Sequence, residues 1–185
     1  RPELIKEVSR RFGSSTIVIS IEAIRKPDGC YEAYTDNGRE KTGVDVFEWA
    51  SRVVDLGAGE IMLTSIDQEG TGKGFDLELT KEVSESVPIP VIACGGSGKL
   101  SHIRDVITEG KADAVSMASI LHYNFINQCD TEDDFSSEGN TEYLRSRRVF
   151  SKVQDTTIIE IKEYLTQNGL KCRYPVSRVI HDRAD

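Results

Sequence analysis

The chain has 185 residues, of which 38% are hydrophobic and 29% charged, a composition typical of a globular protein that can bury a sizeable core. Its formal net charge of −8 argues against non-specific binding to nucleic acid or to an anionic membrane surface, although a local basic pocket can still hold an anion. No apolar run approaches the roughly 18 residues that a membrane-spanning helix requires. We therefore expect a single domain over residues 1–185, with no nucleic-acid or membrane partner.

Cysteine and histidine spacing indicates neither a disulfide framework nor a metal site. The four cysteines lie far apart and form no Cys-x-x-Cys pair, which favours free thiols in a reducing compartment, the cytoplasm. They are Cys30, Cys94, Cys129 and Cys172. The three histidines are equally scattered, so we predict no metal site, and no motif points to a cofactor.

The amino-terminal part of the chain predicts a helix, a buried strand and a β-hairpin. Apolar residues recur at helical spacing from Pro2 to Phe12, and Gly13 ends that segment. The β-branched stretch TIVISIEAI, residues 16–24, is typical of a buried strand. Alternating residues over 31–43 flank Asp36-Asn37-Gly38, a strong signal for a tight hairpin turn.

From residue 44, amphipathic helices alternate with short apolar strands. Helices are predicted over 44–57, 75–86 and 99–110, and strands over 60–66, 90–94 and 112–119. This alternation predicts a parallel sheet built by right-handed crossovers. Four parallel strands fit either an open sheet, whose edges invite pairing with another chain, or half of an eight-stranded barrel. The pattern alone does not choose between the two.

A polar stretch over residues 124–156 interrupts this alternation. It is acidic at first and then basic, and we interpret it as a surface insertion, either a solvated loop or an ordered arm that binds a partner. A last amphipathic helix is predicted over 158–169, where Gly169 ends it.

The segment VIACGGSGKL, residues 91–100, is the main candidate for ligand binding, because function in parallel α/β proteins concentrates at the carboxyl ends of strands. It is neither a P-loop nor a G-x-G-x-x-G motif, since the required residues are absent. Gly95 and Gly96 can still let backbone amides approach an anion ahead of a helix amino end, or they can be plain turn glycines. Ala118-Ser119, after the last strand, could offer a similar site.

Acidic side chains near other strand ends are candidates for chemistry. Glu22 lies among apolar residues of the first strand, where a lone acid is costly unless it is paired. It is therefore a candidate general acid or base, with a structural role as the alternative. Asp67 and Glu69 follow the second strand closely, but loop acids often only cap turns or helices.

Three stretches resemble the cyclase subunit of imidazole glycerol phosphate synthase: GAGEIMLTSIDQEGTGKGFD, PVIACGGSGKLSH and ADAVSMASILHY. PELIKEVSRRFGSSTIVISIEAIR and the following hairpin are similar to the fifth-strand region of that family. The resemblance covers roughly residues 1–124 and resumes in EIKEYLTQNGLKCR. It implies an α/β fold of the (β/α)8 TIM-barrel family, to which this chain supplies about four βα units, the carboxy-terminal half-barrel, plus the hairpin.

The resemblance also implies an activity, that of a lyase in histidine biosynthesis. In the family, ammonia from a glutaminase partner travels through the barrel to a ribulosyl aminoimidazole carboxamide substrate that carries two phosphates. Two aspartates supply acid–base catalysis, and the products are imidazole glycerol phosphate and an aminoimidazole carboxamide ribotide.

Family positions carry over to this chain residue by residue. The phosphate-binding and substrate-binding positions fall on Thr64, Asp67, Glu69, Gly70, Thr71, Gly95, Gly96, Ala118 and Ser119. Glu22 stands at a catalytic position, and Glu60 matches a charged residue of the gate that faces the glutaminase.

Three departures qualify what the resemblance implies. Glu22 and Glu69 both stand where the family has aspartate, and a misplacement of about 1 Å can cost roughly 10²-fold in rate. The first four βα units are absent, and with them the other catalytic aspartate and the other phosphate site. We therefore expect activity to require a complementary half-barrel or self-association.

Two alternatives stay open. The 124–156 insertion and Glu22 resemble paralogues that use ammonia to amidate a sugar in surface-polysaccharide biosynthesis. The chain could also be a non-catalytic phosphate-binding module that self-associates to bury its sheet edges.

Overall fold

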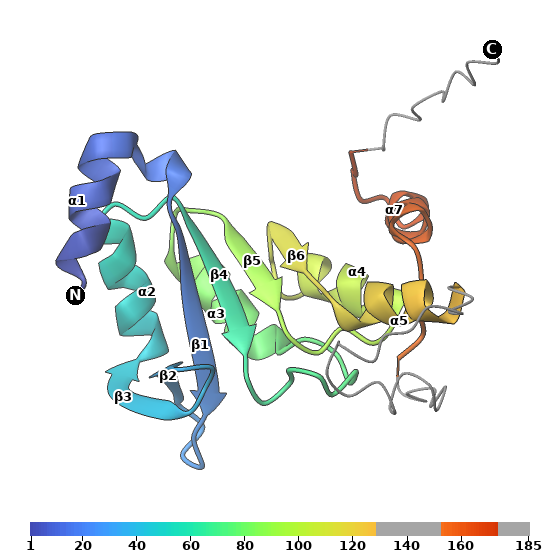
Figure 1. Cartoon of the computed structure of the whole chain (residues 1–185), viewed down its shortest axis with the longest axis horizontal. Helices are drawn as coiled ribbons and strands as arrows, with labels where there is room; N and C mark the ends of the chain where they lie inside the picture. The colour runs from blue at the N-terminus through green and yellow to red at the C-terminus, as the bar shows by residue number, and fades with distance from the viewer. Residues whose placement is uncertain (129–152, 174–185) are drawn as a thin grey trace, which may run out of the picture.

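The structure, a computed structural model, describes residues 1–128 and 153–173 (Figure 1). Its elements in chain order are α1 (Glu3–Phe12), the 3-10 turn η1 (Ser14–Thr16), β1 (Val18–Arg25), β2 (Tyr31–Thr35), β3 (Glu40–Asp45), α2 (Val46–Asp55), β4 (Glu60–Ser65), α3 (Leu77–Ser86), β5 (Val91–Cys94), α4 (Leu100–Thr108), β6 (Ala114–Ser116), α5 (Ser119–Gln128) and α7 (Ile158–Gln167). The helices and strands predicted over residues 2–119 are confirmed, with bounds that differ from the predicted ones by a few residues.

One sheet joins all six strands, in the order β3-β2-β1-β4-β5-β6. Strands β1, β4, β5 and β6 run parallel, as the alternation of helices and strands predicts. The hairpin β2–β3 adds to the same sheet by pairing antiparallel with β1, a placement that the sequence left open. The α/β class with a parallel sheet is thus confirmed.

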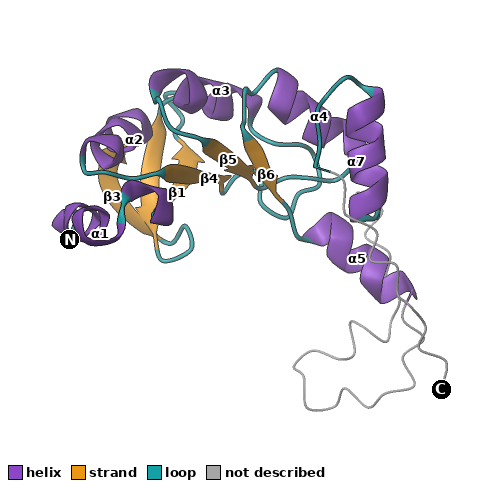
Figure 2. Ribbon diagram, turned by 90° about the horizontal axis from the view of Figure 1, so that it is seen from above, coloured by secondary structure: helices purple, strands orange, loops and turns teal. Residues whose placement is uncertain are grey.

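Alternate strand residues build the core on one face of the sheet. Their apolar side chains pack with residues of α2 and α3, and the members of this cluster include Ile21, Ala23, Ile61, Leu63, Val91, Ala50, Val53, Leu79 and Val83. Figure 2 shows α2, α3 and α4 following one another along this side of the sheet. Buried strands covered by helices on one face explain the β-branched, apolar character of these segments.

The intervening strand residues point to the opposite face, which we call the open face. Strand register places these residues in two rows across the sheet, Ser20–Met62–Ile92 and Glu22–Thr64–Cys94–Ser116. None of these residues is fully buried, and α2, α3, α4 and α7 all lie on the other side in Figure 2. The open face is where a closed barrel would have its interior.

The segment predicted as an insertion is described only at its two ends. Helix α5 runs to Gln128, so the first residues of that segment continue a helix rather than a loop. Residues 129–152, including Cys129, lie outside the described residues. The chain then runs beside the strand ends, where the Gln154 amide donates to the Gly98 carbonyl at 2.7 Å and the Thr156 amide donates to Ile120 at 3.2 Å.

The described cysteines Cys30, Cys94 and Cys172 are free thiols. Across residues 1–128 and 153–173, no helix is both long and apolar enough to cross a membrane. The same residues hold no group of three or more His, Cys, Asp or Glu placed to bind a metal ion.

The Asp76 side chain joins the loop after β4 to the first turn of helix α3 and to Tyr31. Its carboxylate accepts from the Leu79 amide at 3.1 Å and from the buried Tyr31 hydroxyl at 3.1 Å. Asp76→Ala removes both acceptors and should lower the free energy of unfolding by about 1–2 kcal/mol, the range for a lost amino-terminal cap. Asp76→Asn keeps an oxygen in place and should lose less than half of that. Urea unfolding measures both, and equal losses would show that the cap oxygen contributes nothing.

Candidate functional site

The carboxyl ends of β4, β5 and β6 surround a small cavity of about 100 Å³, which we call the anion seat. Six of its lining residues are predicted site residues: Glu69, Gly70, Gly95, Gly96, Ala118 and Ser119. The remaining lining residues are Gly72, Cys94, Ser97, Ser116, Met117 and Val153. The seat is smaller than the roughly 300–1,000 Å³ of sites that enclose a drug-sized ligand, so it suits one charged end of a longer molecule.

The two adjacent glycines of the seat have no room for side chains. Both adopt positive φ angles, 96° at Gly95 and 102° at Gly96. A β-carbon on Gly96 would overlap the Gly74 carbonyl oxygen, and one on Gly95 would lie 2.8 Å from the Ser65 carbonyl oxygen. The Gly74 amide also donates to the Gly96 carbonyl at 2.8 Å. These glycines are therefore required both for the turn and for close contact between the β4 and β5 loops.

Two helices begin beside the seat, and their amino ends favour an anion there. Helix α4 follows the glycine loop and starts at Leu100, with no side chain capping its amino end. Helix α5 starts at Ser119, which itself lines the seat. The first amides of each helix lack intrahelical partners and carry the positive end of the helix dipole.

Ser97 adds a hydroxyl to these backbone groups. Its Oγ is buried and has no hydrogen-bond partner among the described residues, and the residue lines the seat. A buried hydroxyl without a partner is costly, so a bound anion would satisfy it. The sequence contains Ser97 inside the GGSGK loop, but nothing in the pattern separates a ligand hydroxyl from an ordinary loop serine.

A row of polar side chains crosses the open face and ends at the seat. Glu22 pairs in register with Thr64, Thr64 with Cys94, and Cys94 with Ser116, so all four lie on one face at one level of the sheet. Cys94 and Ser116 also line the seat. With strands about 4.8 Å apart, Glu22 lies roughly 10 Å along the sheet from Cys94. A ligand with its anionic end in the seat can thus present an atom to Glu22.

Glu22 is paired with the turn of the hairpin. Its Oε2 accepts from the Gly38 amide at 2.8 Å, and a β-carbon on Gly38 would lie 3.0 Å from the Ile66 side chain. The hairpin turn therefore closes over the end of β1 and β4. This charge-assisted hydrogen bond replaces water at the Glu22 carboxylate and so reduces the cost of placing the acid among apolar neighbours.

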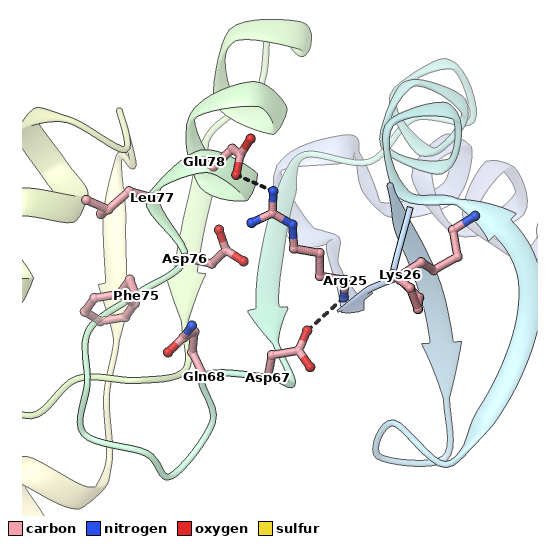
Figure 3. Close-up of a pocket in the computed structure, with 9 residues that line it drawn as sticks. Arg25, Lys26, Asp67, Gln68, Phe75, Asp76, Leu77 and Glu78 are labelled. Carbon is pink, nitrogen blue, oxygen red and sulfur yellow. Dashed lines mark hydrogen bonds and ion pairs between the residues drawn. The ribbon is translucent and has the colours of Figure 1, made fainter. Parts of the chain in front are cut away.

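Arg25 and Asp67 brace the rim rather than the seat (Figure 3). Asp67 accepts from the Arg25 amide at 2.8 Å, and the Arg25 guanidinium reaches Glu78 at 2.9 Å. Both residues line a separate cavity of about 520 Å³. The Arg25–Glu78 pair is about half exposed, so its contribution to stability is small.

Two further predicted residues also lie away from the seat. The Thr71 hydroxyl donates to the Gln68 carbonyl at 2.8 Å and so shapes the loop that carries Glu69 and Gly70. Glu60 begins β4 opposite Val18, at the amino end of the sheet and far from the glycine loops along the strand. The structure thus brings together the glycine, Ala118 and Ser119 positions, sets Thr64 between them and Glu22, and places Glu60 at the opposite end.

Substitutions at Gly96 and Gly29 distinguish two effects on anion binding: strain from a side chain at a positive φ angle, and loss of the close contact between the β4 and β5 loops. Gly96→Ala should force the β4 and β5 loops apart and weaken binding of inorganic phosphate at least tenfold, because the new β-carbon overlaps the Gly74 carbonyl. Gly29→Ala is the matched control, since Gly29 also has a positive φ of 90° but open space around it. Titration of phosphate monitored by NMR measures both. Unchanged affinity in Gly96→Ala would remove the glycine loop from the site.

Comparison with known proteins supports the resemblance drawn from the motifs. Residues 1–127 match the family described as "Histidine biosynthesis protein". Over 126 residues the chain is 50% identical to the imidazole glycerol phosphate synthase subunit HisF of Alkaliphilus metalliredigens (strain QYMF), a match that covers 68% of this chain and 50% of that protein. The chain therefore spans about half the length of this curated relative. With these motifs, a parallel α/β sheet and a match over most of its length, the chain belongs to the histidine biosynthesis protein family, whose fold is the (β/α)8 barrel.

Proposed function

We propose that this chain is the phosphate-binding half of a cyclase of the imidazole glycerol phosphate synthase type. The polar row that joins Glu22 to the anion seat carries the proposal, because it supplies an acid–base group and an anion site at a fixed separation. The substrate is a bisphosphorylated ribulosyl aminoimidazole carboxamide, and the enzyme is a lyase. The 50% identical relative is a subunit of imidazole glycerol phosphate synthase, which supports this assignment.

The seat would hold one of the two substrate phosphates. Backbone amides of the Gly95-Gly96 loop and of the first turn of α5 would donate to its oxygens, and Ser97 would add a hydroxyl. Glu22 would then give or accept a proton at the reacting part of the substrate. The Gly38 amide bonds only Oε2, so the carboxylate can act on substrate through its other oxygen while the hairpin turn holds it in place.

Ammonia would reach this point from the other end of the barrel. Glu60 lies at the amino end of β4 and faces the open side, where a glutaminase partner would dock. The barrel interior would run from Glu60 past Met62 to Thr64, which are the open-face residues of that strand.

A complementary half-barrel is required because the described sheet has an uncovered face and open edges. Strand β2 pairs with β1 only over Glu22–Arg25, which leaves residues 18–21 without a strand on that side in the described part of the chain. A cavity of about 510 Å³ lies beside this free edge. Val18, which lines this cavity, is 50% exposed, and Leu4 and Phe12 of the preceding helix α1 are 47% and 60% exposed. The partner is a separate half-barrel or a second copy of this chain.

Specific observations favour the two alternative functions. Val153 lines the seat and follows directly on the segment outside the described residues, so the insertion end shapes the ligand site, as a sugar-amidating paralogue with a different substrate would require. The Glu22–Gly38 bond favours a non-catalytic phosphate-binding module, in which this carboxylate serves structure alone.

Enzymatic assay separates these functions. Purified chain, supplied with a complementary half-barrel and ammonium salts, should convert the ribulosyl substrate. Glu22→Gln should lower kcat by about 10²–10⁴-fold, the usual range for loss of an acid–base group. Glu22→Asp restores the aspartate of the family and should retain or raise activity. Equal activity in wild type and Glu22→Gln would exclude this residue as the catalytic acid, and turnover of a sugar substrate alone would favour the paralogue.

Sedimentation tests the open face. At micromolar concentration the chain should associate with itself or with the added half-barrel, because the apolar side chains of Met62 and Ile92 on the open face and the free strand edges are otherwise exposed to water. Met62→Lys and Ile92→Lys place charges on that face and should weaken association at least tenfold. Glu85→Lys on the exposed side of α3 is the control and should change nothing. A stable wild-type monomer would contradict the proposed assembly.

A further inference from the structure

His102 lies behind the anion seat, between the two loops that form it. It is the third residue of helix α4, and its Nδ1 accepts from the Gly98 amide at 3.2 Å. Its ring packs on the β4–α3 loop, since a β-carbon on Gly74 would lie 3.5 Å from the ring. Gly74 in turn donates to Gly96. His102 therefore contacts both loops without lining the seat itself.

The contact with Gly98 specifies one chemical form of the imidazole. An amide N–H can donate only to a ring nitrogen that carries no proton, so Nδ1 is the acceptor and the proton of neutral His102 lies on Nε2. In the imidazolium both nitrogens are donors, and the Gly98 amide loses its partner. Gly98 is buried, so an unpaired amide there is costly and the loop is expected to rearrange.

We propose that His102 is the positioning residue of the phosphate site, with neutral imidazole holding the Gly95–Gly98 loop in the shape that binds an anion. It acts through the Gly98 amide and the Gly74 contact rather than by touching the phosphate. This role rests on the proposed function in one respect only, namely that the seat binds phosphate.

The charges around the ring keep it in this form near neutral pH. Burial lowers the pKa of His102, the Lys99 ammonium lowers it further, and the Asp105 carboxylate opposes both. The β4–α3 loop that packs on the ring carries one charged residue next to Gly74 in the sequence, Lys73. Because the folded-state pKa lies below the ordinary value of about 6.5, the acceptor is present above that pH and is lost as the pH falls through the lowered value.

The experiment compares three forms of the full chain: wild type, His102→Asn and His102→Leu. Asparagine places its Oδ1 where Nδ1 lies and does not titrate, whereas leucine offers no acceptor. Inorganic sulfate is the probe, because its charge stays the same while the pH is lowered from 7.5 through the pKa of His102, whereas the charge of phosphate changes. Calorimetry gives its dissociation constant, and amide hydrogen exchange over residues 95–98 reports loop order without ligand.

At pH 7.5, wild type and His102→Asn should bind sulfate within about twofold of each other, and His102→Leu should bind about tenfold more weakly with faster exchange. As the pH falls below the lowered pKa of His102, which NMR of the ring protons locates, wild type should come to bind at least threefold more weakly than His102→Asn. This comparison cancels the general rise in positive charge and needs no leucine variant. Equal affinity and equal exchange in all three forms would overturn the proposal. If wild type binds no sulfate at pH 7.5, the phosphate site of the proposed function fails, and the exchange rates alone decide whether His102 orders the loop.

Discussion

The candidate site depends on a backbone-to-backbone contact between Gly74, in the loop after β4, and Gly96, in the loop after β5. No side chain fits between the two loops, and one amide–carbonyl hydrogen bond ties them together. Because the contact uses only backbone, the amides of the glycine loop sit close to the amino ends of α4 and α5. The same closeness places the His102 ring against both loops. An anion site made of backbone donors needs this rigidity, since each donor is worth little unless it is held in place.

The second constraint is that helices cover only one face of the sheet. Apolar residues such as Ile61 and Leu63 are completely buried against α2 and α3, while their neighbours Met62 and Thr64 are only partly covered. A parallel sheet is usually covered on both faces, so the open face and the free edge of β1 support the proposed assembly with a second half-barrel. This agrees with a chain that spans half of its relative.

In the proposed assembly, the acid Glu22, the anion seat and the contact with a second half-barrel share the open face. The row from Glu22 to Ser116 lies on the surface that a second half-barrel would enclose, so closing the barrel would also exclude water from the acid and the seat. Exclusion of water strengthens every charge interaction in a site. The hairpin turn also lies beside the acid, since the Gly38 amide donates to Glu22 and Gly38 lies close to the Ile66 side chain.

The sequence by itself determined the elements and their type, because periodicity records which side of each element is buried. Alternating apolar strands and amphipathic helices were enough to predict a parallel α/β sheet, and the GGSGK loop and Glu22 were identifiable as unusual at strand ends. Only the tertiary structure decided that the hairpin pairs with β1, that Gly38 binds Glu22, and that Val153 reaches the seat. These contacts join segments far apart in the chain, and they depend on strand register and loop closure, which no local pattern encodes.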